Sequence, residues 1–235
     1  MTAPISRPAA QPASRGRLVA GGGAGSGDAA PGAGGGAARQ KRMALTGPRR
    51  ALAAIMAFAG PVAVAAAADR GWLARADRAG FRTVLASRCP AGTTVARAVS
   101  VLAEPGVVYP LLAVAGAARR EGLRGACLPC LIVASGAVAR RRLSRVIARQ
   151  RPPAEAWLSE PEGFSLPSKH TTLAVLAAGA CVRALDARGA AARAAPALVG
   201  AAVGVSRVYL GVHWPADVVA GWLFAEGWLR LTAPD

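Results

Sequence analysis

Long apolar runs separated by arginines are the feature that most constrains the fold of this chain. From residue 51 onward, alanine-rich runs recur over 51–68, about 97–118, 123–139, 171–187, 194–210 and 214–231. Each is close to the roughly 20 residues that an α-helix needs to cross a bilayer core. Their small residues allow helix backbones to approach closely, and no alternating pattern marks a strand. We therefore predict an all-α membrane bundle of about six transmembrane helices.

The charge of the chain supports a membrane location. Hydrophobic residues make up 53% of the sequence, yet the formal net charge is +17. A soluble globular protein typically has a lower apolar fraction. A basic chain could also bind nucleic acid, but here the arginines are spread between apolar runs and no nucleic-acid-binding motif is present. We expect membrane lipids, and no nucleic acid, as partners.

The two parts of the chain differ in composition. Residues 1–47 are rich in Gly, Ala, Pro and Ser, so they cannot bury enough apolar surface to fold, and we predict a disordered basic tail. Residues 48–235 form the predicted membrane-embedded domain. Basic residues immediately before the first apolar run predict a cytoplasmic N-terminus; these are Arg39, Lys41, Arg42, Arg49 and Arg50.

Residues suited to phosphate chemistry lie where the last two apolar runs meet. Ser206 and Arg207 are followed by His213 and then by Asp217. A guanidinium presents a fork of donors that fits phosphate oxygens. An imidazole can attack phosphorus or transfer protons near neutral pH. Because Asp217 follows His213 by four residues, it lies one helical turn away and can orient the ring.

Two upstream segments carry related residues. One is Arg151-Pro152, and the other is Pro167-Ser168-Lys169-His170, which holds the second of only two histidines. Together the three segments resemble the type 2 phosphatidic acid phosphatase superfamily, which also includes the vanadium haloperoxidases. Its motifs are Lys-x6-Arg-Pro, Pro-Ser-x-His and Ser-Arg-x5-His-x3-Asp. The third motif matches at every defining position, and the second matches its Pro, Ser and His.

The resemblance implies a membrane lipid-phosphate phosphatase and assigns roles within it. His213 would be the nucleophile that forms a phosphohistidine, Asp217 its orienting partner, and His170 the acid that protonates the leaving group. The resemblance implies no metal and no cofactor, because arginines neutralise the phosphate. The phosphate-binding positions that it implies are Arg151, Ser168, Lys169, Ser206 and Arg207.

The first motif departs from the family pattern. Ser144 stands where the motif has lysine, and Lys169 stands where glycine is usual. Our hypothesis is that Lys169 or Arg145 supplies the missing cation at the phosphate, although Arg145 is rotated about 100° from position 144 around a helix. Arg141, Arg145 and Arg149 recur every four residues and share a helix face. Such a stripe is more typical of a solvated or headgroup-facing surface than of a pocket.

Other polar residues have simpler interpretations. Glu104, within the second run, is expected near the lipid headgroups rather than in a functional role. Cys127 and Cys130 have redox-motif spacing, but they lie in an apolar run and are interpreted as packing residues. The charged, amphipathic connector at 69–94 could lie at the membrane interface. The glutamates between the first two motifs, including Glu162, are interpreted as loop charges.

Counting sides of the membrane gives a predicted location for the site. With a cytoplasmic N-terminus and six spans, the loops that carry Arg151, His170 and His213 all fall on the outer face. We therefore predict a bacterial plasma-membrane protein with an extracytoplasmic site. An Ala- and Arg-rich composition is typical of high-GC bacteria and favours a polyprenyl carrier as the lipid.

Several alternatives stay open at the level of sequence. Phosphatidic acid and prenyl mono- or diphosphates are further substrate candidates, and the oligomeric state cannot be read from the residues. The same pocket could instead hold vanadate in a haloperoxidase-like oxidoreductase. A phosphohistidine could also pass its group to an alcohol, which would make the protein a phosphotransferase. Loss of the motif lysine could have produced an inactive homologue.

Overall fold

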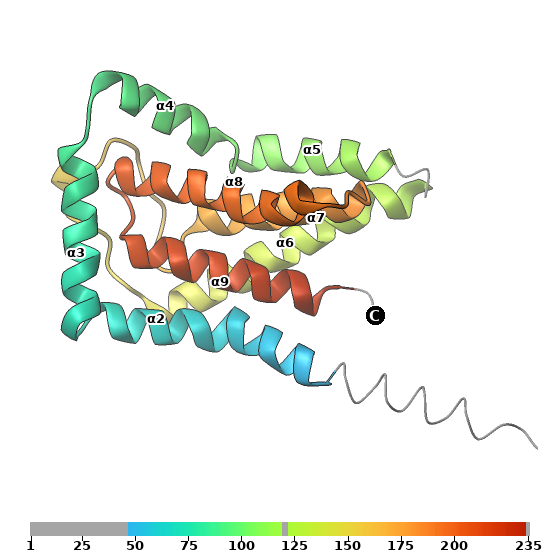
Figure 1. Ribbon diagram of the computed structural model, residues 1–235, viewed down its shortest axis with the longest axis horizontal. Helices are drawn as coiled ribbons and strands as arrows, with labels where there is room; N and C mark the ends of the chain where they lie inside the picture. The colour runs from blue at the N-terminus through green and yellow to red at the C-terminus, as the bar shows by residue number, and fades with distance from the viewer. Residues whose placement is uncertain (1–46, 119–121, 234–235) are drawn as a thin grey trace, which may run out of the picture. The chain divides into compact units, whose positions relative to one another are not determined.

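The computed structural model of the protein describes residues 47–118 and 122–233, and within them every regular element is helical (Figure 1). The predicted all-α class is confirmed. The predicted tail at 1–47 lies, except for its last residue, outside the described part. The elements in chain order are η1 (Ile55–Ala59), α2 (Gly60–Ala68), α3 (Gly71–Ala86), α4 (Pro90–Val101), α5 (Pro105–Ala117), α6 (Gly122–Ile147), η2 (Ala154–Ala156), α7 (Lys169–Ala184), α8 (Ala190–Tyr209) and α9 (Pro215–Leu231).

The second predicted span is broken rather than continuous. Helix α4 ends at Val101, α5 begins at Pro105, and the two helices are bent by 49°. A proline disfavours helical backbone at the residue before it, and Glu104 is accordingly extended at the N-cap of α5. The predicted connector at 69–94 is also helical, since it contains α3 and the start of α4.

Helix α7 lies inside the bundle and packs against α5, α6, α8 and α9. Its Leu173, Val175 and Leu176 are buried in the main apolar core. Small residues allow the close helix contacts that the composition predicts. At Gly227 of α9, a Cβ atom would lie 2.4 Å from the backbone nitrogen of Ala57, so only glycine permits this approach to the first helix.

The outer surface of the helices is apolar, as a bundle in lipid requires. Large apolar side chains that are more than half exposed include those of Leu111, Leu131 and Leu198. Among the described helices, Gly47–Ala68 and Leu123–Ile147 are long and apolar enough to cross a membrane, and α4 with α5 would add a third, broken span. The protein is an integral membrane protein, and the count of six spans stays a prediction.

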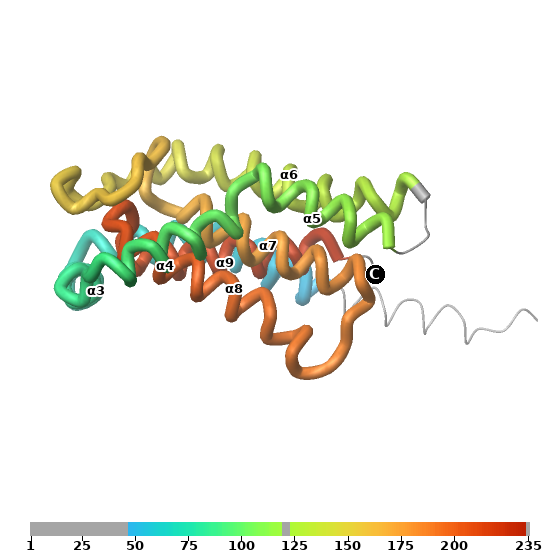
Figure 2. Tube along the Cα trace, turned by 90° about the horizontal axis from the view of Figure 1, so that it is seen from above, coloured from blue at the N-terminus to red at the C-terminus, as the bar shows by residue number. Residues whose placement is uncertain are grey.

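Helix α3 lies across one end of the bundle, at the turn that joins α8 to α9 (Figure 1). The long segment between α6 and α7, residues 148–168, reaches the same end (Figure 2). Arg88, just after α3, ties these parts together: its Nε donates to the Tyr209 carbonyl at 2.8 Å and its Nη2 to the Ala156 carbonyl at 2.7 Å. The polar residues of the three sequence motifs gather at this end.

Candidate active site

A cavity of about 170 Å³ lies at this end of the bundle. Five separate parts of the chain line it: the break between α4 and α5, the 148–168 segment, the first turn of α7, the last turn of α8, and the turn before α9. The lining residues are Glu104, Arg151, Ser159, Glu160, Pro161, Glu162, Lys169, His170, Arg207 and His213. The two histidines, although 43 positions apart in sequence, therefore face one cavity.

His213 is held by the start of helix α9. Trp214 is the N-cap residue and Pro215 begins the helix, while Asp217, the third helical residue, accepts a 2.8 Å capping hydrogen bond from the backbone nitrogen of Trp214. The same carboxylate oxygen, Oδ2, lies 3.3 Å from His213 Nδ1, and both side chains are almost fully buried. One capping residue thus fixes the helix end and the imidazole together.

The protonation of His213 follows from its two neighbours. Arg151 Nη1 lies 3.3 Å from His213 Nε2, and a guanidinium can only donate. Nε2 is therefore the acceptor, while Nδ1 carries the proton and donates it to Asp217. Burial lowers the pKa of His213 to about 4, against the opposing effect of the Asp217 carboxylate. The ring is neutral at physiological pH, with the Nε2 lone pair on the cavity side.

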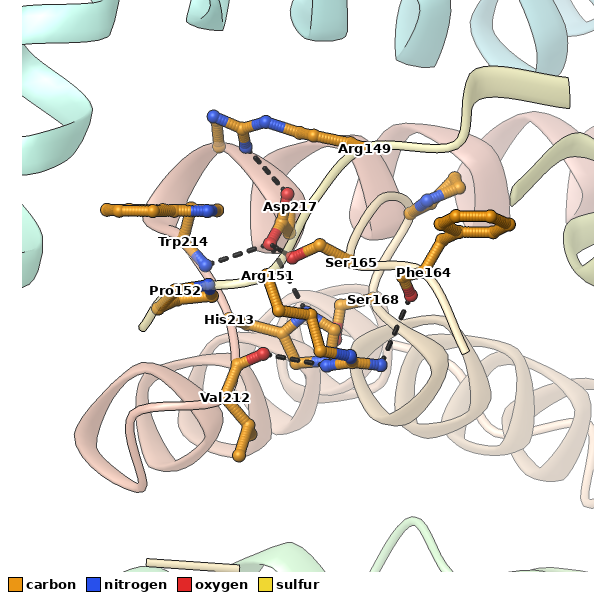
Figure 3. A network of polar contacts seen from close by, with 12 residues as sticks. Arg149, Arg151, Pro152, Phe164, Ser165, Ser168, Val212, His213, Trp214 and Asp217 are labelled. Atoms are coloured by element: carbon orange, nitrogen blue, oxygen red, sulfur yellow. Dashed lines mark hydrogen bonds and ion pairs between the residues drawn. The ribbon is translucent and has the colours of Figure 1, made fainter. Parts of the chain in front are cut away.

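Arg151 is fixed by backbone carbonyls. Its Nη1 donates to Val212 and its Nη2 to Phe164, at 2.7 and 3.1 Å (Figure 3). Its Nε also donates to Gly163 at 2.8 Å, and its Nη2 to Glu162 at 2.7 Å. These bonds join the 148–168 segment to the turn that carries His213. The guanidinium consequently stays beside the imidazole, and it has no ion pair with a carboxylate among the residues that the structure describes.

The opposite wall of the cavity pairs His170 with Glu104. His170 Nε2 lies 2.8 Å from Glu104 Oε1. Glu104 was expected near the lipid headgroups rather than in the site, but the helix break at Pro105 turns its carboxylate into the cavity. Arg207 lies on the same wall, where its Nη1 donates to Ser100 at 2.7 Å. Its buried Nε has no hydrogen-bond partner among the described residues.

The remaining predicted residues lie at different depths. Lys169 lines the cavity and forms a 3.3 Å ion pair with Glu162. Ser168 is fully buried as the N-cap of α7, and Ser206 donates to the Val203 carbonyl of its own helix. Neither serine lines the cavity. Arg145 does not line it either; it borders a neighbouring cavity described below.

The site also contains residues that the sequence interpretation did not include. Arg149 Nη1 donates to Asp217 Oδ1 at 2.7 Å, and its Nη2 donates to Asp77 Oδ2 of α3 at 2.7 Å. Ser165 donates a hydrogen bond to Asp217 Oδ2 (Figure 3). Helix α6 ends at Ile147 and Ala148 has a positive φ of 50°, so Arg149 leaves the helical stripe to which its spacing had assigned it. No pattern in the sequence indicated this turn.

Comparison with known proteins gives the family. The PAP2 superfamily profile matches residues 125–234. The decaprenylphosphoryl-5-phosphoribose phosphatase of Mycolicibacterium smegmatis is 35% identical over 147 residues, which cover 60% of this chain and 76% of that protein. The chain belongs to the PAP2 superfamily and is a phosphatase. The resemblance noted in the sequence is thereby confirmed.

Solved structures have the same fold. The transmembrane PAP2-type phosphatidylglycerolphosphate phosphatase of Bacillus subtilis is similar with a TM-score of 0.61 and 28% identity, covering 73% of this chain and 88% of that one. Aquifex aeolicus LpxE is similar in fold, with a TM-score of 0.54 and 24% identity over 65% of this chain and 93% of that one. Both alignments support the helical bundle, and the Bacillus subtilis enzyme is a transmembrane protein.

Proposed function

We propose that this phosphatase hydrolyses a phosphomonoester or diphosphate of a lipid, of the polyprenyl-carrier or phosphatidic-acid type. The reaction proceeds without a metal ion, through a phosphohistidine at His213. One observation carries the proposal: His213 is held between Asp217 and Arg151, at 3.3 Å from each, in a cavity that also contains His170 and Arg207. A base-oriented nucleophile, a second imidazole and two guanidiniums are the groups that phosphoryl transfer needs.

In the first step the Nε2 lone pair of His213 attacks phosphorus. The P–N bond forms while the bond between phosphorus and the lipid oxygen breaks. The protonated form of His170, which the Glu104 carboxylate favours against a burial that lowers the pKa of His170 to about 4, gives its proton to that oxygen. Asp217 keeps the Nδ1 proton and stabilises the positive charge that develops on the ring. Arg151 Nη1, whose hydrogen bond to Nε2 is given up when the lone pair attacks, donates instead to a non-bridging oxygen. The unpartnered Nε of Arg207 donates to another.

In the second step water attacks the phosphohistidine. The neutral His170 takes a proton from that water, a P–O bond forms, and the P–N bond breaks to return the lone pair to His213. Glu104 holds the His170 ring in place through both steps. The cycle leaves both histidines as they began and releases inorganic phosphate.

A lipid substrate is supported by the surroundings of the site and by the relatives. The cavity lies at one end of a bundle whose outer surface is apolar, so an amphiphile can present its phosphate there while its chain stays in lipid. The M. smegmatis relative acts on a decaprenylphosphoryl compound. We further propose a bacterial plasma-membrane location with the site on the extracytoplasmic face, which the side count in the sequence supports.

The first test is phosphate release by detergent-purified protein in EDTA. The panel contains a polyprenyl phosphate, a polyprenyl diphosphate, phosphatidylglycerol phosphate and phosphatidic acid, with His213→Gln as the matched variant. We expect wild-type release that the variant loses by at least about 10³-fold. A label from the substrate phosphate should be trapped on wild-type protein as an acid-labile, alkali-stable adduct. Equal release by both proteins would refute the assigned nucleophile.

Two further arms test the rest of the proposal. Added alcohols that accept the phosphate would show a transferase activity, whereas inorganic phosphate as the sole product supports hydrolysis. A membrane-impermeant phosphate ester supplied to intact spheroplasts reports the side of the site. Hydrolysis without lysis supports an extracytoplasmic site, and hydrolysis only after lysis contradicts it.

A further inference from the structure

A second cavity, of about 300 Å³, lies next to the first one. It is bounded by the end of α6, the 163–164 part of the long segment and the first residue of α7. Its lining residues are Arg140, Arg141, Ser144, Arg145, Glu162, Gly163, Phe164 and Lys169. Four of these side chains are basic and one is acidic. The excess of positive charge is concentrated in a space large enough for a phosphate group.

The two cavities share a wall. Glu162 and Lys169 line both of them, and their 3.3 Å ion pair stands at the boundary. The Glu162 side chain is 85% exposed, so this pair is weakly held. An anion in the second cavity can replace Glu162 as the partner of Lys169, and the lysine can then serve groups on both sides of the boundary.

The arginines of the second cavity are available to a ligand. Within the described part of the chain, Arg141 and Arg145 have no ion-pair partner, whereas Arg140 is anchored by a 3.1 Å hydrogen bond to the Pro167 carbonyl. Arg141 and Arg145 lie four residues apart on one helix face and so present their guanidiniums to the same ligand. The small side chain of Ser144 leaves room between them.

From these observations we propose that the second cavity binds a second anionic group of the same substrate molecule. The substrate class is a lipid phosphate that carries, beyond the phosphate to be removed, a further phosphate or carboxylate within reach of Arg141 and Arg145. This inference rests on the proposed function, because the first cavity holds the phosphate that reacts. It assigns a specificity role to Arg145, which the sequence had offered, as an alternative to Lys169, for the missing cation at the reacting phosphate.

The test compares two substrates that differ only in the second group. One is a short-chain prenyl phosphoryl pentose 5-phosphate. In the other, a neutral ether replaces the phosphodiester that joins the prenyl chain to the pentose, and the 5-phosphate is unchanged. The variant is Arg141→Gln/Arg145→Gln. Its matched control is Arg142→Gln, which removes an exposed arginine of the same helix that does not line the cavity.

We expect the double variant to raise KM for the first substrate by about tenfold or more, since two charge-assisted contacts are lost. Its kcat on that substrate, and both constants on the neutral-linked substrate, should stay within about twofold of wild type. Arg142→Gln should resemble wild type on both. Equal losses on the two substrates, or no loss on either, would overturn the second anion site.

A lipid arm separates the two possible sources of the anion. Phosphatidylglycerol is added to the mixed micelles as a competitor. The anion comes from the bilayer if this lipid inhibits turnover of the first substrate by wild type but not by the double variant, and if the two substrates have equal KM values when the lipid is absent. That result would overturn a site for the substrate. Turnover of the neutral-linked substrate in EDTA reports on the proposed function by itself, so its absence would count against the reaction rather than against the second cavity.

Discussion

Arg149 donates a 2.7 Å hydrogen bond to Asp217, the carboxylate that holds His213, and a second 2.7 Å hydrogen bond to Asp77 of α3. Asp77 in turn accepts from the backbone nitrogen of Ala216 at the start of α9. A helix lying across the end of the bundle is thus linked to the nucleophile through one guanidinium. All three charged side chains are at most 8% exposed, so each depends on the others for compensation.

Arg149→Met should therefore destabilise the bundle more than any exposed arginine does. It leaves Asp77 and Asp217 buried without a cation, which typically costs about 3–5 kcal/mol. Thermal unfolding in detergent should show a clear drop in Tm, whereas Arg142→Met should show almost none. Adding Asp77→Asn to Arg149→Met should recover part of the loss, because one of the uncompensated charges is removed. If Asp77→Asn leaves the drop in Tm of Arg149→Met unchanged, the result would contradict this network.

The pH profile of activity should show no fall near neutrality from protonation of His213. Burial lowers the pKa of His213 to about 4, and the nucleophile must be neutral, so activity is present above that pH and lost as pH falls through it. After correction for titration of the substrate phosphate, kcat/KM should not fall as the pH is lowered from 7 to about 5. If activity instead falls on acidification with an apparent pKa near 6.5, which is the pKa of an ordinary histidine, His213 is not shielded as described.

His170→Gln should discriminate between leaving groups. A lipid alkoxide needs a proton as it departs, so kcat on a prenyl phosphate should fall by about 10²–10⁴-fold. An aryl phosphate such as nitrophenyl phosphate needs no proton, and its first step should be nearly unaffected. The variant should then accumulate the phosphohistidine, because the second step still lacks its base. Equal losses on the two substrates would remove His170 from the role of general acid.

Glu104→Gln should act through His170. The amide can hydrogen-bond to the ring, but it no longer favours the charged imidazole. We expect kcat to fall by about tenfold with KM nearly unchanged, and the alkaline limb of the pH profile to move to lower pH. Glu160 lines the same cavity and forms no hydrogen bond or ion pair within the described part of the chain, so Glu160→Gln provides the control. Identical pH profiles for wild type and Glu104→Gln would leave Glu104 with a purely structural role.

Gly211 should be intolerant of a side chain because of its position just before His213. Its φ is +79°, and a Cβ atom would lie 2.0 Å from the Ala156 carbonyl oxygen. Gly189 has a similar φ of +97° with open space around it. Gly189→Ala should cost about 1–3 kcal/mol of backbone strain, because its ψ of −178° puts it in a region that essentially only glycine adopts. Gly211→Ala should also displace the His213 turn and lower kcat/KM by at least about 100-fold. Similar activities for the two variants would be inconsistent with this packing.

Much of this organisation was predictable from the sequence, because apolar runs and motif spacing are local properties. The runs gave the helices, and the His213–Asp217 spacing predicted their contact. The position of Glu104 was not predictable in the same way, since the break before Pro105 decides which way its carboxylate points. Ser168 and Ser206 matched motif positions, yet both are used in local hydrogen bonds behind the cavity.

The arginines show a second reason why the site could not be predicted in full from the sequence. Arg141, Arg145 and Arg149 look equivalent by spacing, but Ala148 ends the helical geometry and sends Arg149 to Asp217 while the other two border the second cavity. Arg149 and Asp217 are 68 residues apart in sequence. Their pairing depends on the tertiary structure and cannot be predicted from local composition.

The cavity is assembled from five segments that meet only when α5, α7, α8 and α9 are packed together. A fragment that lacks one of these helices therefore lacks part of the catalytic set. Turnover measured in detergent consequently serves as an assay of correct folding: specific activity counts the fraction of molecules whose bundle is intact, and it can rank detergents and lipids before any other probe of conformation is applied.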